Sequence, residues 1–173
     1  SLEDFEQVLE ADHTNFEAVI GRTSALLLLD RKKEAARYVD DGLKNFPGNP
    51  FLLYCRGLIL NAKEQYKKAI PDFTEAIRAG NAEVNSRALI SRGIAYQQTQ
   101  NYKQAIADFT MAIEQSEEKI NALYNRGFAY YQLGDYTDAI SDFNRVIEAD
   151  NDNAYAYYNL GMAYFRSNDK LNA

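Results

Sequence analysis

The stretch that decides the fold is YNRGFAYYQLGDYTDAISDFNRVI, residues 124–147. It returns in altered form upstream, as SRGIAYQQTQNYKQAIADFTMAI at residues 91–113 and as YCRGLILNAKEQYKKAIPDFTEAI at residues 54–77. A sequence that repeats at a fixed period of a few tens of residues is typical of architectures built from stacked structural units. The chain is therefore expected to be an array of similar units rather than one irregular domain.

One glycine in each unit sets the register of the repeat. Apolar residues four positions before and three positions after the glycine fall on one helical stripe. A second helical pattern follows, with Ala, Ile and Phe on one face, and Gly134-Asp135 marks the turn between the two helices. Each unit is predicted to be a pair of antiparallel amphipathic helices, which must stack on neighbouring pairs to bury their apolar faces. The register glycines, which recur at a nearly constant spacing, are Gly57, Gly93, Gly127 and Gly161.

A glycine inside a helix costs about 1 kcal/mol relative to alanine, so its recurrence needs a physical reason. Without a Cβ at this position, the second helix of the unit can approach closely. A phenylalanine follows three of the glycines at one constant spacing, which predicts that its ring packs on the glycine backbone. An earlier unit has Thr23 in place of the glycine and Val39 in place of the phenylalanine. The three phenylalanines are Phe73, Phe109 and Phe143.

This combination of a period of about 34 residues with Gly, Tyr, Ala and Phe at fixed places resembles the tetratricopeptide repeat. The resemblance covers essentially the whole chain and implies an all-α fold, a right-handed superhelical solenoid of antiparallel helix pairs. Only Pro47 stands at the family's unit-closing proline, and Pro71 falls inside a second helix, where it is expected to kink that helix or delay its start. A single solenoid over residues 1–173, a fragment of a longer array, is expected to consist of a half repeat at 1–15, full repeats at 16–49, 50–85, 86–119 and 120–153, and a half repeat at 154–173.

An arginine precedes the register position in every full unit. In three of the four units an aspartate follows the arginine, at the same spacing that separates the glycine from its phenylalanine, whereas Arg22 in the first full unit faces Tyr38 instead. A row of arginines is one way to bind an acidic ligand, whereas an Arg–Asp bridge would join the two helices of each unit. Because the aspartate accompanies the arginine, the bridge is the prediction. The pairs are Arg56 with Asp72, Arg92 with Asp108, and Arg126 with Asp142.

The first helices carry a second apolar face. At about 100° per residue, positions −6, −3, +1 and +4 from the glycine lie together, away from the core stripe. On a solvated face they would be polar, but most are aromatic or aliphatic, and aromatic and Met side chains are enriched at recognition surfaces. In the tetratricopeptide family this face lines the inside of the superhelical groove, and neighbouring first helices cover part of it. The predicted groove residues are Phe51, Tyr54, Leu58, Ile90, Ile94, Tyr124, Phe128, Tyr131, Tyr155, Tyr158, Met162 and Phe165.

The function predicted from this face is a non-enzymatic protein-interaction module or scaffold. Its concave aromatic groove would bind an apolar or amphipathic peptide segment, helical in form, with tyrosine hydroxyls at the wet rim. Family members that hold the acidic tails of heat-shock chaperones use lysine, arginine and asparagine in the groove. Here only Asn125 and Asn159 match that pattern, and Tyr124 and Phe128 stand among the expected basic partners. A chaperone-tail adaptor is the less favoured interpretation, and both asparagines are kept as groove residues.

A structural self-assembly element is the alternative function. The first nine residues have the pattern of a second helix without its first, and residues 157–173 have the pattern of a first helix without its second. These terminal half repeats are complementary, so that one chain could dock on the next and form rings or filaments. Exposure of Leu160, Tyr164 and Leu171 would favour such self-association.

The remaining composition excludes several classes of function. A net charge of −6 argues against a nucleic-acid or anionic-membrane surface, and the longest apolar run, Ala25–Leu29, is too short for membrane insertion. Cys55, the single cysteine, cannot form an internal disulfide, so the sequence does not require an oxidising compartment; it leaves the location unknown and favours the cytoplasm. His13 and Cys55 lack the partners that a metal site or an activated nucleophile needs, which predicts no cofactor, no metal and no enzyme activity.

Overall fold

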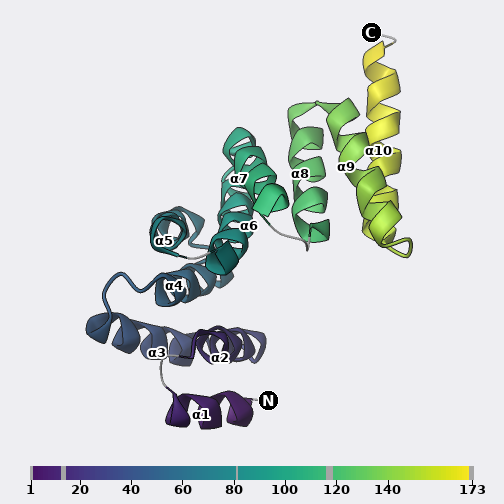
Figure 1. The fold of residues 1–173 in the computed structure, drawn as a ribbon. Helices are drawn as coiled ribbons and strands as arrows, with labels where there is room; N and C mark the ends of the chain where they lie inside the picture. The colour runs from purple at the N-terminus through teal and green to yellow at the C-terminus, as the bar shows by residue number, and fades with distance from the viewer. Residues whose placement is uncertain (1, 13–14, 81, 116–118, 172–173) are drawn as a thin grey trace. The chain divides into compact units, whose positions relative to one another are not determined.

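The computed structural model describes residues 2–12, 15–80, 82–115 and 119–171, and over these ranges the chain forms ten helices and no strand (Figure 1). The predicted all-α fold of stacked helix pairs is confirmed. His13 lies outside the described residues. The helices are α1 (Leu2–Ala11), α2 (Phe16–Leu28), α3 (Lys32–Asn45), α4 (Pro50–Ala62), α5 (Tyr66–Ala79), α6 (Ala82–Gln98), α7 (Tyr102–Gln115), α8 (Ile120–Leu133), α9 (Tyr136–Ala149) and α10 (Ala154–Leu171).

The chain divides into two compact units, Ser1–Ser91 and Arg92–Ala173, with the boundary inside α6. In the first unit, α2 packs against α1, α3 and α4, and α4 packs against α5. In the second unit, α8 packs against α7 and α9, and α9 lies between α8 and α10. Each unit is therefore a stack in which first and second helices alternate.

Asparagine side chains fix the start of several first helices. Asn15 Oδ1 accepts a hydrogen bond from the Ala18 N–H at 3.0 Å at the start of α2. Asn49 does the same for the first turn of α4, which then opens with Pro50. Asparagine satisfies helix N–H groups that lack an intrahelical partner, and proline tolerates the first helical position because it has no N–H to satisfy.

Each turn between the helices of a pair contains one residue in the left-handed backbone conformation. Gly134, where the sequence predicts a turn, has φ 80°. Asp30, Glu64 and Gln100 occupy the same register in the other pairs, with φ of 55°, 58° and 61°. For residues with a Cβ this conformation costs about 1–2 kcal/mol, so these three turns are strained relative to the one at Gly134.

Pro71 does not delay the start of its helix, which was one of the two effects expected from the sequence. α5 begins at Tyr66 and runs to Ala79 with Pro71 in its interior, on the exposed side. Once the first turn of α5 is formed, a proline costs the helix one hydrogen bond and crowds the preceding turn. The buried residues Ala69, Phe73 and Ala76 on the other side of the helix hold it in place.

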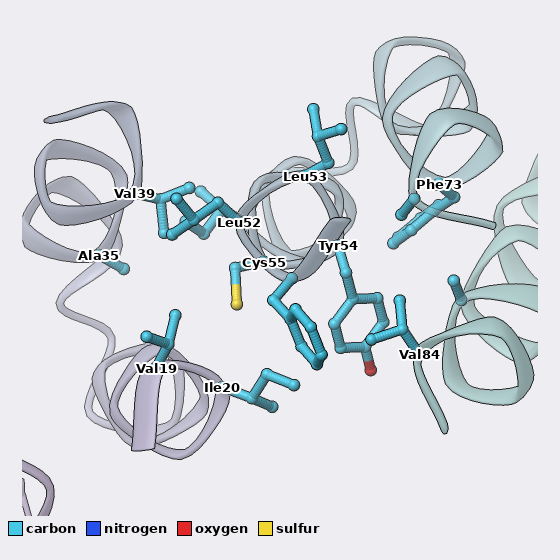
Figure 2. Packing of buried hydrophobic residues seen from close by; sticks show 14 of the residues in the cluster. Val19, Ile20, Ala35, Val39, Leu52, Leu53, Tyr54, Cys55, Phe73 and Val84 are labelled. Carbon is cyan, nitrogen blue, oxygen red and sulfur yellow. The ribbon is translucent and has the colours of Figure 1, made fainter. Parts of the chain in front are cut away.

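The core of the first unit lies where α2, α3, α4 and α5 meet (Figure 2). Cys55 points into this core among Val19, Ile20 and Ala35, and its side chain is completely buried. Burial raises the pKa of the Cys55 thiol to about 12, because the charged thiolate would lose its hydration, and a hydrogen bond with Thr23 only partly opposes this. Cys55 is therefore a packed, neutral thiol.

The predicted packing of phenylalanine on glycine is confirmed in all three repeats that carry the pair. A Cβ added to Gly57 would overlap the Phe73 ring, and one added to Gly93 would lie 2.6 Å from Phe109 Cε1. At Gly127 the corresponding distance to Phe143 Cε1 is 3.0 Å. In the first full repeat Thr23 and Val39 are both fully buried. Thr23 is larger than the glycine of the other repeats, and its partner Val39 is smaller than their phenylalanine.

The predicted Arg–Asp bridges are confirmed as well. Arg126 donates from Nε and Nη2 to the two carboxylate oxygens of Asp142, at 2.7 and 2.8 Å. Arg56 with Asp72 and Arg92 with Asp108 make the same two-pronged contact. Hydrogen bonding to its aspartate raises the pKa of each arginine. These arginines therefore join helices rather than offering a free basic row for an acidic ligand.

Arg22 pairs differently, as its sequence context predicts. Its guanidinium lies 4.3 Å from the centre of the Tyr38 ring. It also donates to Glu6 Oε1 at 3.2 Å, a contact with α1 that the sequence did not predict. Burial raises the pKa of the Tyr38 hydroxyl, with Arg22 partly opposing the shift.

Candidate functional site

Packing within the first unit takes up part of the predicted groove face. The side chains of Phe51 and Tyr54 are each only 7% exposed. The Tyr54 ring lies next to Phe73 and Val84, and its centre is 6.1 Å from that of Phe73 (Figure 2). Leu58, on the next turn of α4, is half-buried against the same core. Ile90 and Ile94 on α6 are also half-buried.

Apart from Ile94 on α6, the predicted residues of the second unit lie on two helices that contact each other, α8 and α10. Tyr124, Phe128 and Tyr131 on α8 are half-buried and pack against the core around Phe143. The side chains on α10 are far more open: Tyr155 is 75%, Tyr158 67% and Phe165 61% exposed. We call the following set the α8–α10 face. It consists of Tyr124, Phe128, Tyr131, Tyr155, Tyr158, Met162 and Phe165.

Hydrogen bonds hold the two helices of this face in register. Asn159 Nδ2 donates to the Tyr124 hydroxyl at 2.8 Å, which joins α10 to α8. Asn125 Nδ2 donates to the Asn121 carbonyl at 2.8 Å, and the Asn125 carbonyl accepts from Gln97 Nε2 on α6. Of the two asparagines predicted as groove residues, Asn159 thus holds an aromatic side chain of the face, whereas the Asn125 side chain bonds to the backbone of its own helix.

The α8–α10 face carries no formal charge of its own. Two arginines lie close to it in sequence: Arg126, which is held by Asp142 and also donates to the Thr110 hydroxyl at 3.0 Å, and the exposed Arg166, which follows Phe165 on α10. What the face offers a ligand is therefore apolar ring surface, one flexible thioether and the tyrosine hydroxyls. Such a surface binds by removing apolar area from water, with hydrogen bonds at its edge setting orientation.

The opposite side of α10 is open too, and the sequence placed its residues in a core stripe. Tyr157 and Tyr164 occupy core register positions, yet they are 51% and 50% exposed. Leu160, between them, is half-buried, and the Leu171 side chain is outside the described residues. Tyr158 holds the position of Tyr124, whose ring centre lies 6.0 Å from that of Phe143 on the following helix. A tyrosine at this position is partly covered by the following helix in the α8–α9 pair. Part of the exposure of Tyr158 therefore arises on this second open side of α10 and not on the α8–α10 face.

Two further observations limit the chemistry of the described residues. No group of three or more His, Cys, Asp or Glu side chains comes together there as a metal site. No helix within the described ranges has the length and apolar character needed to cross a bilayer.

Comparison with known proteins gives matches in sequence pattern and in structure. A family model for the TPR repeat matches residues 93–134 and 129–168. The TPR protein YrrB, described as having an unusual peptide-binding site, is similar in structure with a TM-score of 0.73 at 25% identity, over 97% of this chain and 86% of that chain. No curated protein sequence matches.

Two domains of RPAP3 are similar over two thirds of the chain. The second TPR domain of human RPAP3, in complex with the HSP70 peptide SGPTIEEVD, has a TM-score of 0.62 at 28% identity over 67% of this chain and 98% of that one. The first TPR domain of Spaghetti (RPAP3), bound to the HSP90 peptide SRMEEVD, has a TM-score of 0.64 at 23% identity over 67% of this chain and 90% of that one. The periodic glycines with their phenylalanines, the stacked helix pairs and these matches together show that the chain belongs to the tetratricopeptide repeat family, a fold that generally serves protein interaction rather than catalysis.

Proposed function

We propose that the chain is a protein-interaction module that binds an uncharged apolar or amphipathic peptide segment on the α8–α10 face. The observation that carries the proposal is the exposure of Tyr155 and Phe165, 75% and 61%, beside the partly buried rings of α8. Both lie at groove register positions, −6 and +4 from Gly161. Large aromatic side chains left exposed along one face of a helix cost free energy in water and are typical of surfaces that a partner covers.

The shape and chemistry of the face favour an amphipathic helix as the bound segment. Such a helix presents apolar side chains at positions i, i+3 or i+4, and i+7, which suits a surface formed by two neighbouring helices. Met162 adapts to irregular partner shapes because its side chain is unbranched and polarizable. The tyrosine hydroxyls give hydrogen-bonding groups at the edge of the contact.

The similarity to peptide-binding relatives supports a peptide partner, but the charge of the face favours a different peptide. The HSP70 peptide in the complex with human RPAP3, SGPTIEEVD, contains three acidic side chains. None of the seven residues of the α8–α10 face is basic, and Arg126 beside it is occupied by Asp142, although Arg166 follows Phe165 on α10. Burying unpaired carboxylates against aromatic rings would cost several kcal/mol, which disfavours an acidic tail here.

Selection from a displayed library of random peptides tests the proposal. The chain is immobilised, and selected peptides are then compared on a face variant, Tyr155→Glu with Phe165→Glu. A matched control, Leu28→Glu with Leu29→Glu, changes two similarly exposed apolar residues in the first unit. Circular dichroism checks that both variants keep the helical content of the wild type.

The expected result is enrichment of uncharged peptides with apolar residues at helical spacing, which bind the wild type and the control but not the face variant. Peptides that bind all three proteins equally would contradict the site. Enrichment of acidic C-terminal sequences would contradict the uncharged ligand class and support the chaperone-tail interpretation.

A further inference from the structure

An ion pair joins two first helices of the first unit that are not neighbours in the stack. Arg87 Nη1 of α6 lies 3.2 Å from Glu17 Oε1 of α2, and two repeats of sequence separate the residues. α4 stands between the two helices. It packs against α2 on one side, and on the other its Asn61 Nδ2 donates to the Ser91 carbonyl of α6 at 3.2 Å. The ion pair therefore reaches across α4.

The pair crosses α4 on the groove face of the first unit. Glu17, Phe51 and Arg87 hold the same register position, −6, on α2, α4 and α6. Burial raises the pKa of the Tyr54 hydroxyl, and among the smaller effects Arg87 lowers it and Glu17 raises it, so both charges lie near this hydroxyl. Phe51 and Tyr54 are the two groove residues that are almost fully buried. The pair thus spans the closed stretch of the groove face.

The same register position carries no charge in the second unit. It is held by Asn121 on α8 and by Tyr155 on α10, and both side chains are exposed. Neither residue type forms an ion pair at neutral pH. The contact across α4 is therefore a property of the first unit and not a requirement of the repeat.

A contact between the two helices that flank a third depends on the curvature of the stack. Helices packed side by side lie about 8–10 Å apart, so the two outer helices of a straight row of three lie roughly 16–20 Å apart. Glu and Arg side chains meet across such a gap when the row curves toward the side that carries them. The pair is therefore sensitive to how far α2 and α6 open away from α4.

We propose that Glu17 and Arg87 form a clasp that holds the groove face of the first unit closed over Phe51 and Tyr54. Their side chains are 62% and 41% exposed, so added salt weakens the attraction between them. When the clasp is released, α2 and α6 separate on the groove side and the rings on α4 become accessible. This device controls the shape of the first unit, and it operates whether or not a peptide binds the α8–α10 face.

Hydrogen exchange of the full chain, read by mass spectrometry, tests the clasp with Glu17→Gln, Arg87→Gln and the double variant. Each single variant should speed amide exchange in α2 and in residues 82–91 of α6 by about two- to fivefold, the range for an exposed ion pair. Exchange in α9 should stay at the wild-type rate. The two substitutions change the net charge in opposite directions, so a direct effect of charge on exchange would move the two rates apart.

The coupling between the two substitutions decides the test. Glu17 also lies in the first turn of α2, where a carboxylate stabilises the helix by itself. In the double variant, exchange should therefore be about two- to fivefold slower than two independent effects predict, because the clasp is lost only once. Salt at about 1 M should remove most of this coupling. Glu75→Gln, which breaks the Arg78–Glu75 pair within α5, is the matched control and should leave exchange in α2 unchanged.

Nitration by tetranitromethane, which modifies accessible tyrosine rings, tests whether the rings on α4 are uncovered. Tyr54 should react faster in both single variants than in the wild type, while Tyr155, 75% exposed, reacts equally in all of them. Independent effects of the two substitutions on exchange would overturn the proposal, because the pair would then hold nothing together. Equal acceleration in α2 and α9 would overturn it as well, since the substitutions would then destabilise the chain as a whole.

Discussion

Gly93 and Phe109 lie so close that a single methyl group would not fit between them: a Cβ on Gly93 would be 2.6 Å from Phe109 Cε1. The helices α6 and α7 can approach to this distance only because the first of them has no side chain at the contact. The same relationship holds for Gly57 with Phe73 and for Gly127 with Phe143. It is the contact that makes two helices into one repeat.

Gly93→Ala should therefore destabilise the chain although alanine is the better helix former. Overpacking against the buried Phe109 ring costs about 1–3 kcal/mol, and the gain in helix propensity returns about 1 kcal/mol. Urea unfolding should show a lower midpoint. Gly161→Ala is the matched control, and its midpoint should be unchanged or higher because nothing lies within 4 Å of the added Cβ. Equal midpoints for the two variants would contradict this account of the register glycine.

Removing Arg126 alone should cost much more than replacing the whole pair. The Asp142 side chain is 3% exposed, so Arg126→Ala leaves a buried carboxylate without its main partner, at a cost of about 3–5 kcal/mol. Replacing both residues by apolar ones, Arg126→Met with Asp142→Leu, is expected to be far milder. Chemical unfolding of both variants measures the difference. A double variant less stable than Arg126→Ala would contradict this account, because the bridge would then contribute net stability beyond fixing how the two helices pair.

Gln100→Gly should stabilise the second unit. Gln100 has φ 61°, a conformation that costs a residue with a Cβ about 1–2 kcal/mol and glycine little. The greater freedom of glycine in the unfolded chain offsets part of this gain, which leaves a net stabilisation of up to about 1 kcal/mol. Thermal and urea unfolding measure it, with Gln98→Gly, inside the end of α6, as a control that should destabilise.

Cys55 should be unreactive in the folded chain, and its contribution to stability should fall at high pH. Its folded-state pKa of about 12 lies above the ordinary value of 9.0, so the folded chain holds the thiol proton more tightly. That contribution is complete below pH 9 and is lost as pH rises toward 12, by about 1.4 kcal/mol for each pKa unit.

Comparing the wild type with Cys55→Val across this pH range isolates the thiol from the tyrosines, three of which also have a raised pKa. The stability difference between the two proteins should change with pH only above about pH 9. A thiol reagent at neutral pH should label Cys55 only when the chain unfolds. Rapid labelling under native conditions would show that the core around Val19 and Ala35 opens readily.

The contacts that recur in every repeat could be predicted from the sequence, because both partners keep a fixed spacing. Gly127 and Phe143 are separated by the same number of positions as Arg126 and Asp142, and the neighbouring units keep this spacing for both pairs. A periodic pattern of this kind identifies contacts within one helix pair. It also predicted the all-α fold and the family.

The burial of the groove residues could not be predicted, because it depends on which neighbouring helix covers each one. Tyr54 and Tyr124 occupy the same register, yet Tyr54 is nearly buried beside Phe73 and Val84 while Tyr124 stays half-exposed. Helical angles describe the direction of a side chain on its own helix and say nothing of the residue opposite. The left-handed turns at Asp30, Glu64 and Gln100 were missed for a related reason, since no glycine marks them.

The peptide-binding role of the α8–α10 face is tested most directly at Met162. The chain has two methionines, Met162 on this face and the exposed Met111 on α7, so isotope labelling of their methyl groups gives a two-signal spectrum. Met162→Leu assigns the signals, and a peptide selected on the wild-type chain is then titrated in. We predict that the Met162 signal shifts in a saturable manner while the Met111 signal stays in place, and that Tyr155→Glu with Phe165→Glu abolishes the shift. A saturable shift of Met111 alone, or binding that moves neither signal, would contradict the assignment of the binding site to α8 and α10.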